Sequence, residues 1–180
     1  MNSYLRKTPQ VHFLVFLSIV FFTCTPSYAS ANAIEDKLKA LYIVRIAEFI
    51  EWPETTEKTS FNICISKDSP IAKQLQLLQI DTVNKLTLHI VTLNNASSSL
   101  DCDIIYITKE NVPPSITQHP ILTMSSVPNF ARQGGMVEFY ISQSKVRMKA
   151  NLEAFTLAHL KPSSKLIRLL TIVTTEEQRQ

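Results

Sequence analysis

The chain contains almost no glycine. Its two glycines, Gly134 and Gly135, are adjacent, and an alternating apolar stretch follows them. A loop that cradles a nucleotide phosphate needs several spaced glycines between a strand and a helix, so the sequence excludes a loop of that kind. The G-x-S-x-G elbow of a serine hydrolase is also absent. We therefore predict no catalytic residues.

Histidine is also scarce, and its spacing fits no metal site. The four histidines are widely scattered: His12, His89, His119 and His159. Histidine ligands of a metal usually recur about three to five residues apart, or near cysteines. We predict no metal, no cofactor and no enzymatic activity. Asp101 and Asp103 flank Cys102, and we expect both carboxylates to be solvated residues at the start of a strand.

The N-terminal segment carries almost no charge. Arg6 and Lys7 are its only charged residues before Glu35. An apolar stretch over residues 11–22 follows, and small residues surround position 30. This is the layout of a secretory signal, and the stretch is shorter than the roughly 20 residues that span a bilayer. We predict a signal peptide over 1–31, cleaved near 29–33, and one domain over 32–180. An uncleaved anchor, or a lipoprotein signal through Cys24, is the less favoured alternative.

Removal of the signal changes both the charge and the cysteine count. The formal charge of +3 falls to +1 because Arg6 and Lys7 are lost, and no basic run remains to bind nucleic acid. Two cysteines stay, Cys64 and Cys102. In an oxidising compartment two cysteines usually form one disulfide, whereas two separate buried thiols are the alternative.

Hydrophobic periodicity predicts strands that alternate with helices. We predict helices over 34–52, 70–78, 151–159 and 163–173, and strands over 61–65, 86–93, 103–107, 121–124, 136–141 and 145–150. A polar loop at 94–99 and a frayed tail at 178–180 complete the pattern. Such alternation predicts an α/β fold: a mixed, mainly parallel sheet of about five to six strands, with helices on both faces and a C-terminal hairpin. Cys64 and Cys102 lie at strands that can be neighbours in this sheet.

Several segments, in order along the chain, resemble the YfiR family of exported proteins. The resemblance covers essentially all of the chain after the signal. Its segments are residues 39–40, 49–53, 61–65, 102–107, 129–136, 146–147, 151–154 and 163–169. The segments at 61–65 and 102–107 match the two cysteine-bearing strands of that family.

The resemblance implies a function that spacing alone does not. Members of the YfiR family are periplasmic repressors that bind the periplasmic sensor region of an inner-membrane diguanylate cyclase. They form homodimers, and in the best-known system an outer-membrane lipoprotein sequesters the repressor. Two alternatives stay open: a periplasmic small-molecule sensor that acts on a sensor kinase or transporter, and a thiol enzyme that uses Cys64 or Cys102.

Candidate partner contacts are aromatic and arginine residues, because these carry most of the binding energy of protein interfaces. We select Trp52, Phe130, Arg132, Arg147 and Phe155. Phe130 and Phe155 are equally plausible as core residues.

The chain also departs from the family pattern. Some members carry a second cysteine pair, and the corresponding positions here are Ala131 and Glu138. The first helix carries its basic residue at Arg45, which we expect to form a surface pair with Glu48.

Overall fold

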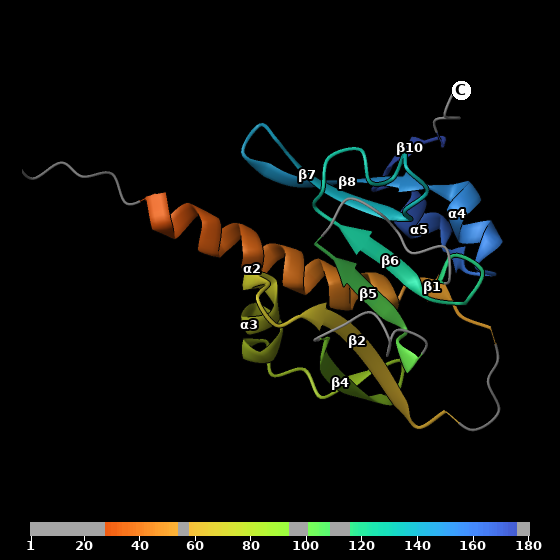
Figure 1. Ribbon diagram of the computed structural model, residues 1–180, viewed down its shortest axis with the longest axis horizontal. Helices are drawn as coiled ribbons and strands as arrows, with labels where there is room; N and C mark the ends of the chain where they lie inside the picture. Colours follow the sequence, from red (N-terminus) through yellow and green to blue (C-terminus); the bar gives the residue numbers. More distant parts are fainter. Residues whose placement is uncertain (1–27, 54–57, 94–100, 109–115, 176–180) are drawn as a thin grey trace, which may run out of the picture. The chain divides into compact units, whose positions relative to one another are not determined.

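The computed structural model describes residues 28–53, 58–93, 101–108 and 116–175 (Figure 1). The predicted signal peptide lies almost wholly outside these residues, as do the predicted loop at 94–99 and the predicted tail. The first described element is helix α2 (Tyr28–Ala47), whose first turns contain the predicted cleavage positions. No helix within the described ranges is long and apolar enough to cross a membrane.

An eight-stranded mixed sheet forms the centre of the fold (Figure 1). Its strand order is β10-β8-β7-β6-β5-β2-β4-β3, and only the β7–β8 and β3–β4 pairs are antiparallel. The predicted α/β class and the mainly parallel sheet are therefore confirmed. The strands are β2 (Ser60–Ser66), β3 (Thr82–Val83), β4 (Leu86–Leu93), β5 (Ile104–Ile107), β6 (Leu122–Ser125), β7 (Val137–Ser142), β8 (Lys145–Asn151) and β10 (Thr171–Val173).

The strand count exceeds our prediction because short strands occur where we predicted helix or loop. Helix α2 ends at Ala47, and Ile50–Glu51 forms β1, which pairs with β9 (Lys161–Pro162) in a separate small sheet. Helix α5 spans only Ser164–Ile167, and the β-branched run that follows it joins β8 as β10. Pairing with a strand remote in sequence overrides local helical spacing at both places.

One face of the sheet carries the main hydrophobic core. Alternate residues of β2, namely Phe61, Ile63 and Ile65, lie in this core. All four described helices contribute their buried apolar residues to it, including α3 (Pro70–Leu77) and α4 (Leu152–Leu157). The coverage of both faces by helices stays a prediction.

The opposite face has a smaller apolar cluster without a described helix. It contains Cys64, Cys102, Ile105, Ile116 and Ile121. Ile116 and Ile121 belong to the connection between β5 and β6, whose described part forms turns rather than an α-helix. The two isoleucines pack with both cysteines in this cluster.

The C-terminal hairpin forms as predicted. Strands β7 and β8 pair from Val137↔Ala150 to Ser142↔Lys145. Gln143 and Ser144 connect them, and both have positive φ, 50° and 57°. Two consecutive residues of positive φ are the geometry of a type I′ turn, which suits the twist of a hairpin.

Gly135 allows the chain to pass closely over the ring of Phe130. The Gly135 N–H donates a 2.9 Å hydrogen bond to the Phe130 carbonyl. A Cβ at position 135 would lie 2.1 Å from Cε1 of Phe130, whose side chain is fully buried. Only glycine fits this approach without displacing the ring.

We expect Gly135→Ala to lower the free energy of unfolding by about 1–3 kcal/mol, because the added methyl group overpacks the Phe130 site. Urea denaturation of the variant measures the loss. Gln133→Ala, an exposed position in the same turn, is the control and should change stability by less than about 0.5 kcal/mol. Equal stability of the two variants would show that the ring is not confined.

Candidate functional site

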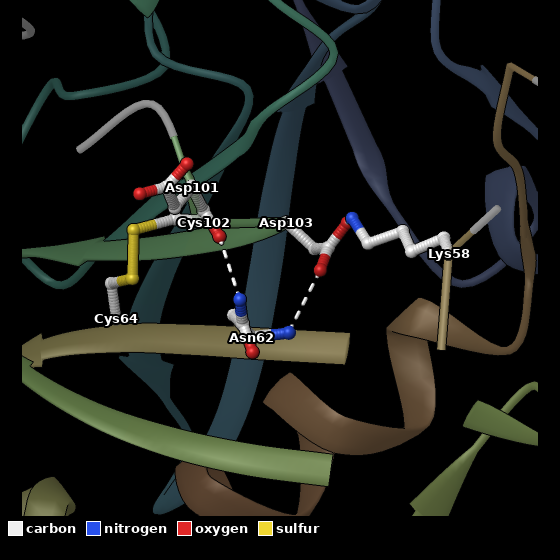
Figure 2. The surroundings of a disulfide bond; sticks show 6 residues. All are labelled: Lys58, Asn62, Cys64, Asp101, Cys102 and Asp103. Atoms are coloured by element: carbon white, nitrogen blue, oxygen red, sulfur yellow. Dashed lines mark hydrogen bonds and ion pairs between the residues drawn. A yellow bond between two sulfur atoms is a disulfide. The ribbon is translucent and has the colours of Figure 1, made fainter. Parts of the chain in front are cut away.

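A disulfide joins the two cysteines across neighbouring strands. Cys64 lies within β2, Cys102 precedes β5, and their Cα atoms are 5.8 Å apart (Figure 2). The parallel register of β2 and β5, which pairs Cys64 with Ile105, brings the two residues together. Both are buried, at 1% and 4% exposure. The prediction of one disulfide is confirmed in the structure.

A polar cluster connects the same two strands beside the disulfide (Figure 2). The Asn62 backbone N–H donates to Asp103 Oδ2 at 2.7 Å, and the Asp103 N–H donates to the Asn62 carbonyl at 2.9 Å. Lys58 Nζ forms an ion pair with the other oxygen of Asp103. Asp103 is only 5% exposed, so our expectation of a solvated carboxylate is wrong at this position. Its hydrogen bonds offset the cost of burying a charge.

A hollow of about 390 Å³ lies next to this cluster. Trp52, Lys58, Cys102, Asp103 and His119 are among its lining residues. Trp52 does not point freely into it: its Nε1–H donates to the Ala47 carbonyl at 3.0 Å. The Trp52 ring also packs edge-on against Phe61, with centroids 5.2 Å apart. The half-buried indole therefore packs against the core at Phe61 and also forms part of the wall of the hollow.

A second polar cluster connects β7 and β8, in another part of the sheet. Glu138 on β7 is 2% exposed, and Lys149 Nζ on β8 donates to its Oε1 at 2.7 Å. The backbone N–H of Ala131 donates to Glu138 Oε2 at 3.2 Å. Residues 131 and 138, where the resemblance led us to expect the second cysteine pair of some family members, are thus in contact. A hydrogen bond connects them here instead of a covalent bond.

Strand β8 presents three cations on the sheet face away from the main core. Lys145, Arg147 and Lys149 alternate with Met148 and Ala150, which belong to the core. Since side chains alternate across a strand, the three cations share one face, which we call the β8 cationic strip. Glu138 neutralises Lys149, whereas Lys145 and Arg147 are exposed.

Tyr140 of β7 lies beside the β8 cationic strip and contacts it. It lies opposite Arg147 in the β7–β8 register. Lys149 Nζ lies 5.0 Å from the centroid of its ring, a cation–π contact. The Tyr140 hydroxyl is 3.4 Å from Thr171 Oγ1 on the edge strand β10. Contacts with β7 and β10 therefore restrain the part of the cationic strip around Lys149.

The five candidate contact residues come from different parts of the chain and differ in burial. Phe130 and Phe155 are buried, at 0% and 1% exposure. Trp52 and Arg132 are half-buried, and Arg147 is exposed. Burial assigns the two phenylalanines to the interior of this structure, which leaves Trp52, Arg132 and Arg147 with accessible surface. Contact of any of them with a partner stays a prediction.

Sequence reasoning missed the buried roles of charged residues. Asp103 and Glu138 each have a lysine partner at a distance in sequence, Lys58 and Lys149. For Glu138 the strand pattern offers a clue, because an acidic residue alternates there with Val137 and Phe139 in a strand of the sheet. The nearby pair Arg45–Glu48 was predictable from helical spacing, and its 3.0 Å ion pair is confirmed.

The sequence matches the model of one known protein family over most of the chain. A family model described as YfiR/HmsC-like matches residues 36–170. This range contains both cysteines, both buried ion pairs and the β8 cationic strip. No curated protein matches the chain.

We expect Cys64→Ala combined with Cys102→Ala to lower the free energy of unfolding by about 4 kcal/mol, on the chain-entropy model of a closed loop. The two cysteines are 38 residues apart, and alanine avoids burying unpaired hydroxyls. Thermal unfolding with and without reductant measures the effect. Reductant should shift the wild type toward the variant and leave the variant unchanged. An oxidised wild type that melts with the variant would refute a stabilising disulfide.

We expect Glu138→Ala to cost about 2–3 kcal/mol, because Lys149 and the Ala131 N–H both lose a charged acceptor in a buried site. Glu138→Gln should cost less, since it keeps an acceptor. The control is Glu48→Ala, which removes the exposed pair with Arg45 and should cost no more than about 0.5 kcal/mol. Chemical denaturation ranks the three variants, and equal losses at positions 138 and 48 would contradict the difference in burial.

Proposed function

The chain belongs to the YfiR/HmsC-like family, and we propose that it is a periplasmic negative regulator of an inner-membrane diguanylate cyclase. In this proposal it binds the periplasmic sensor region of the cyclase and represses synthesis of cyclic di-GMP. The family match over residues 36–170 is the observation that carries the proposal. The protein acts by binding and not by catalysis.

Two further observations support a periplasmic location. Residues 1–31 have the sequence pattern of an export signal. The Cys64–Cys102 disulfide suits an oxidising compartment such as the bacterial periplasm. A protein exported to this compartment would meet the periplasmic part of a membrane-bound cyclase directly.

Repression requires only a difference in affinity. A regulator that binds the inactive state of the sensor more tightly than the active state shifts the population toward the inactive state. A shift from about 99% active to about 1% active needs roughly 5 kcal/mol of difference. No covalent chemistry at the regulator is needed for this shift.

The β8 cationic strip is the contact surface that we favour for the sensor. Arg147 is exposed there, Lys145 adds a second exposed cation, and Tyr140 supplies an aromatic surface beside them. Arginine and tyrosine are enriched at binding hot spots, and a positive patch attracts an acidic partner surface. Trp52 and Arg132 are the other proposed contacts, while Phe130 and Phe155 would act by holding the elements behind the surface.

We also propose that the protein works as a homodimer and that an outer-membrane lipoprotein sequesters it, as the family resemblance implies. Sequestration would remove the regulator from the sensor by mass action, because the lipoprotein and the sensor would compete for the same free protein. Binding of the regulator by the lipoprotein would then relieve the cyclase without any change in the amount of regulator.

Deletion of the gene tests the proposed function. With the cyclase gene intact, cyclic di-GMP in the cell should rise, and expression of the wild-type protein in the deletion strain should lower it again. Mass spectrometry of cell extracts measures both levels. An unchanged level after deletion would exclude repression of a cyclase by this protein.

Charge reversal at the strip tests the contact surface. Arg147→Glu should weaken binding to the isolated sensor region about tenfold or more, the effect of losing a hot-spot contact, and should fail to restore repression. Arg168→Glu is the matched control, since Arg168 is also exposed but lies outside the strip. Periplasmic abundance of both variants must equal the wild type. Equal repression by both would move the contact surface elsewhere.

A further inference from the structure

The order of the parallel strands creates a switch point between β2 and β5. From β2 the chain passes through α3 and β3 to β4 on one side, and β5 later joins the other side of β2. In open α/β sheets, ligands bind outside the carboxyl ends of the strands at such a point. Here these ends are Ser66 of β2 and Ile107 of β5, opposite the end that carries the Asn62–Asp103 contacts.

The N-terminus of α3 lies at this switch point (Figure 1). Ser69 precedes the helix in the capping position, yet its side chain makes no capping hydrogen bond. The residue is 6% exposed, and its Oγ has no hydrogen-bond partner among the described residues. Buried hydroxyls are normally paired, so an unpaired one beside the positive end of a helix indicates a ligand that would accept its hydrogen bond.

A cavity of about 370 Å³ opens at Ser69. Its walls combine the start of α3 with α2, the end of β5 and the segment after β6: Lys39, Ile71, Tyr106, Ser126 and Val127 contribute. Ile71 is buried and Val127 half-buried, so part of the wall is apolar. A volume of this size accommodates a small organic molecule.

The charged and hydroxyl groups around the cavity do not suit a doubly charged anion. Lys39 is 7% exposed, but its ammonium already lies 2.5 Å from Glu35 Oε1. The Tyr106 hydroxyl donates to Ser126 Oγ at 2.7 Å, and burial raises its pKa to about 12, so it stays protonated. A phosphate dianion would need more unpaired cations than these residues supply.

Charged groups of both signs lie around the cavity at Ser69. Asp36 on α2 lines the cavity, and burial raises the pKa of its carboxyl despite the nearby Lys39. Lys67 and Lys73 line an adjoining hollow that also contains Ser69.

We propose that this cavity binds a small organic carboxylate. Ser69 Oγ and the first turn of α3 would bind its carboxylate group, and Ile71 and Val127 would contact its apolar part. This site is separate from the proposed cyclase contact surface and does not depend on it.

Titration of the purified protein with benzoate, benzamide and inorganic phosphate at constant ionic strength tests the site, with amide NMR shifts as the readout. Benzoate should cause saturable shifts at Ser69, Ile71 and Ala72. Benzamide, which has the same shape without the charge, should not. Equal shifts with benzoate and benzamide would overturn the carboxylate assignment, and so would phosphate binding without benzoate binding, or benzoate shifts confined to surface lysines.

Ser69→Ala should reduce benzoate affinity at least about fivefold without lowering the melting temperature, because Ser69 Oγ makes no hydrogen bond that the fold would lose. Ser163→Ala is the matched control: Ser163 precedes α5, and its Oγ accepts from the Leu166 N–H at 3.3 Å. That variant should melt earlier and bind benzoate as the wild type does. Unchanged benzoate affinity in Ser69→Ala would overturn the proposal.

Discussion

The parallel pairing of β2 with β4 on one side and β5 on the other is the interaction on which the rest of the structure depends. Its core-facing residues meet the helices, and its opposite face carries the disulfide. At its N-terminal end Asn62 is bonded to the buried carboxylate of Asp103. At its C-terminal end the chain turns at Ser69 into α3. The hollow beside Asp103 and the cavity at Ser69 therefore lie at opposite ends of this one strand pair.

The structure places covalent and ionic connections at two separate parts of the sheet. The Cys64–Cys102 bond links β2 to the start of β5, whereas the Glu138–Lys149 ion pair links β7 to β8. The first connection depends on the redox state of the compartment and the second does not. At the second site this protein therefore has a buried polar cluster that reductants do not open. Reduction would therefore break only one of the two connections.

Much of the fold was predictable because it rests on local patterns. The alternation of residues in 86–93 predicted β4 with its observed bounds, and Ser69–Pro70 predicted the start of α3. The hairpin between 142 and 145 was predictable in the same way. The candidate site was predictable only in part: the disulfide was identified, but two of the five contact residues, Phe130 and Phe155, are interior. Aromatic type alone does not distinguish a core side chain from an exposed one.

The sequence by itself determined the fold class and the family, and it favoured one disulfide between the two cysteines, because periodicity, cysteine count and short motifs can be read without the folded structure. Only the tertiary structure decided that Asp103 is buried and that Ser69 Oγ lacks a hydrogen-bond partner. It also decided the strands β1 and β10, whose registers join Ile50 to Pro162 and Thr171 to Lys149. These features depend on groups that are far apart in the chain, and their energies appear only when the folded backbone brings the groups into contact.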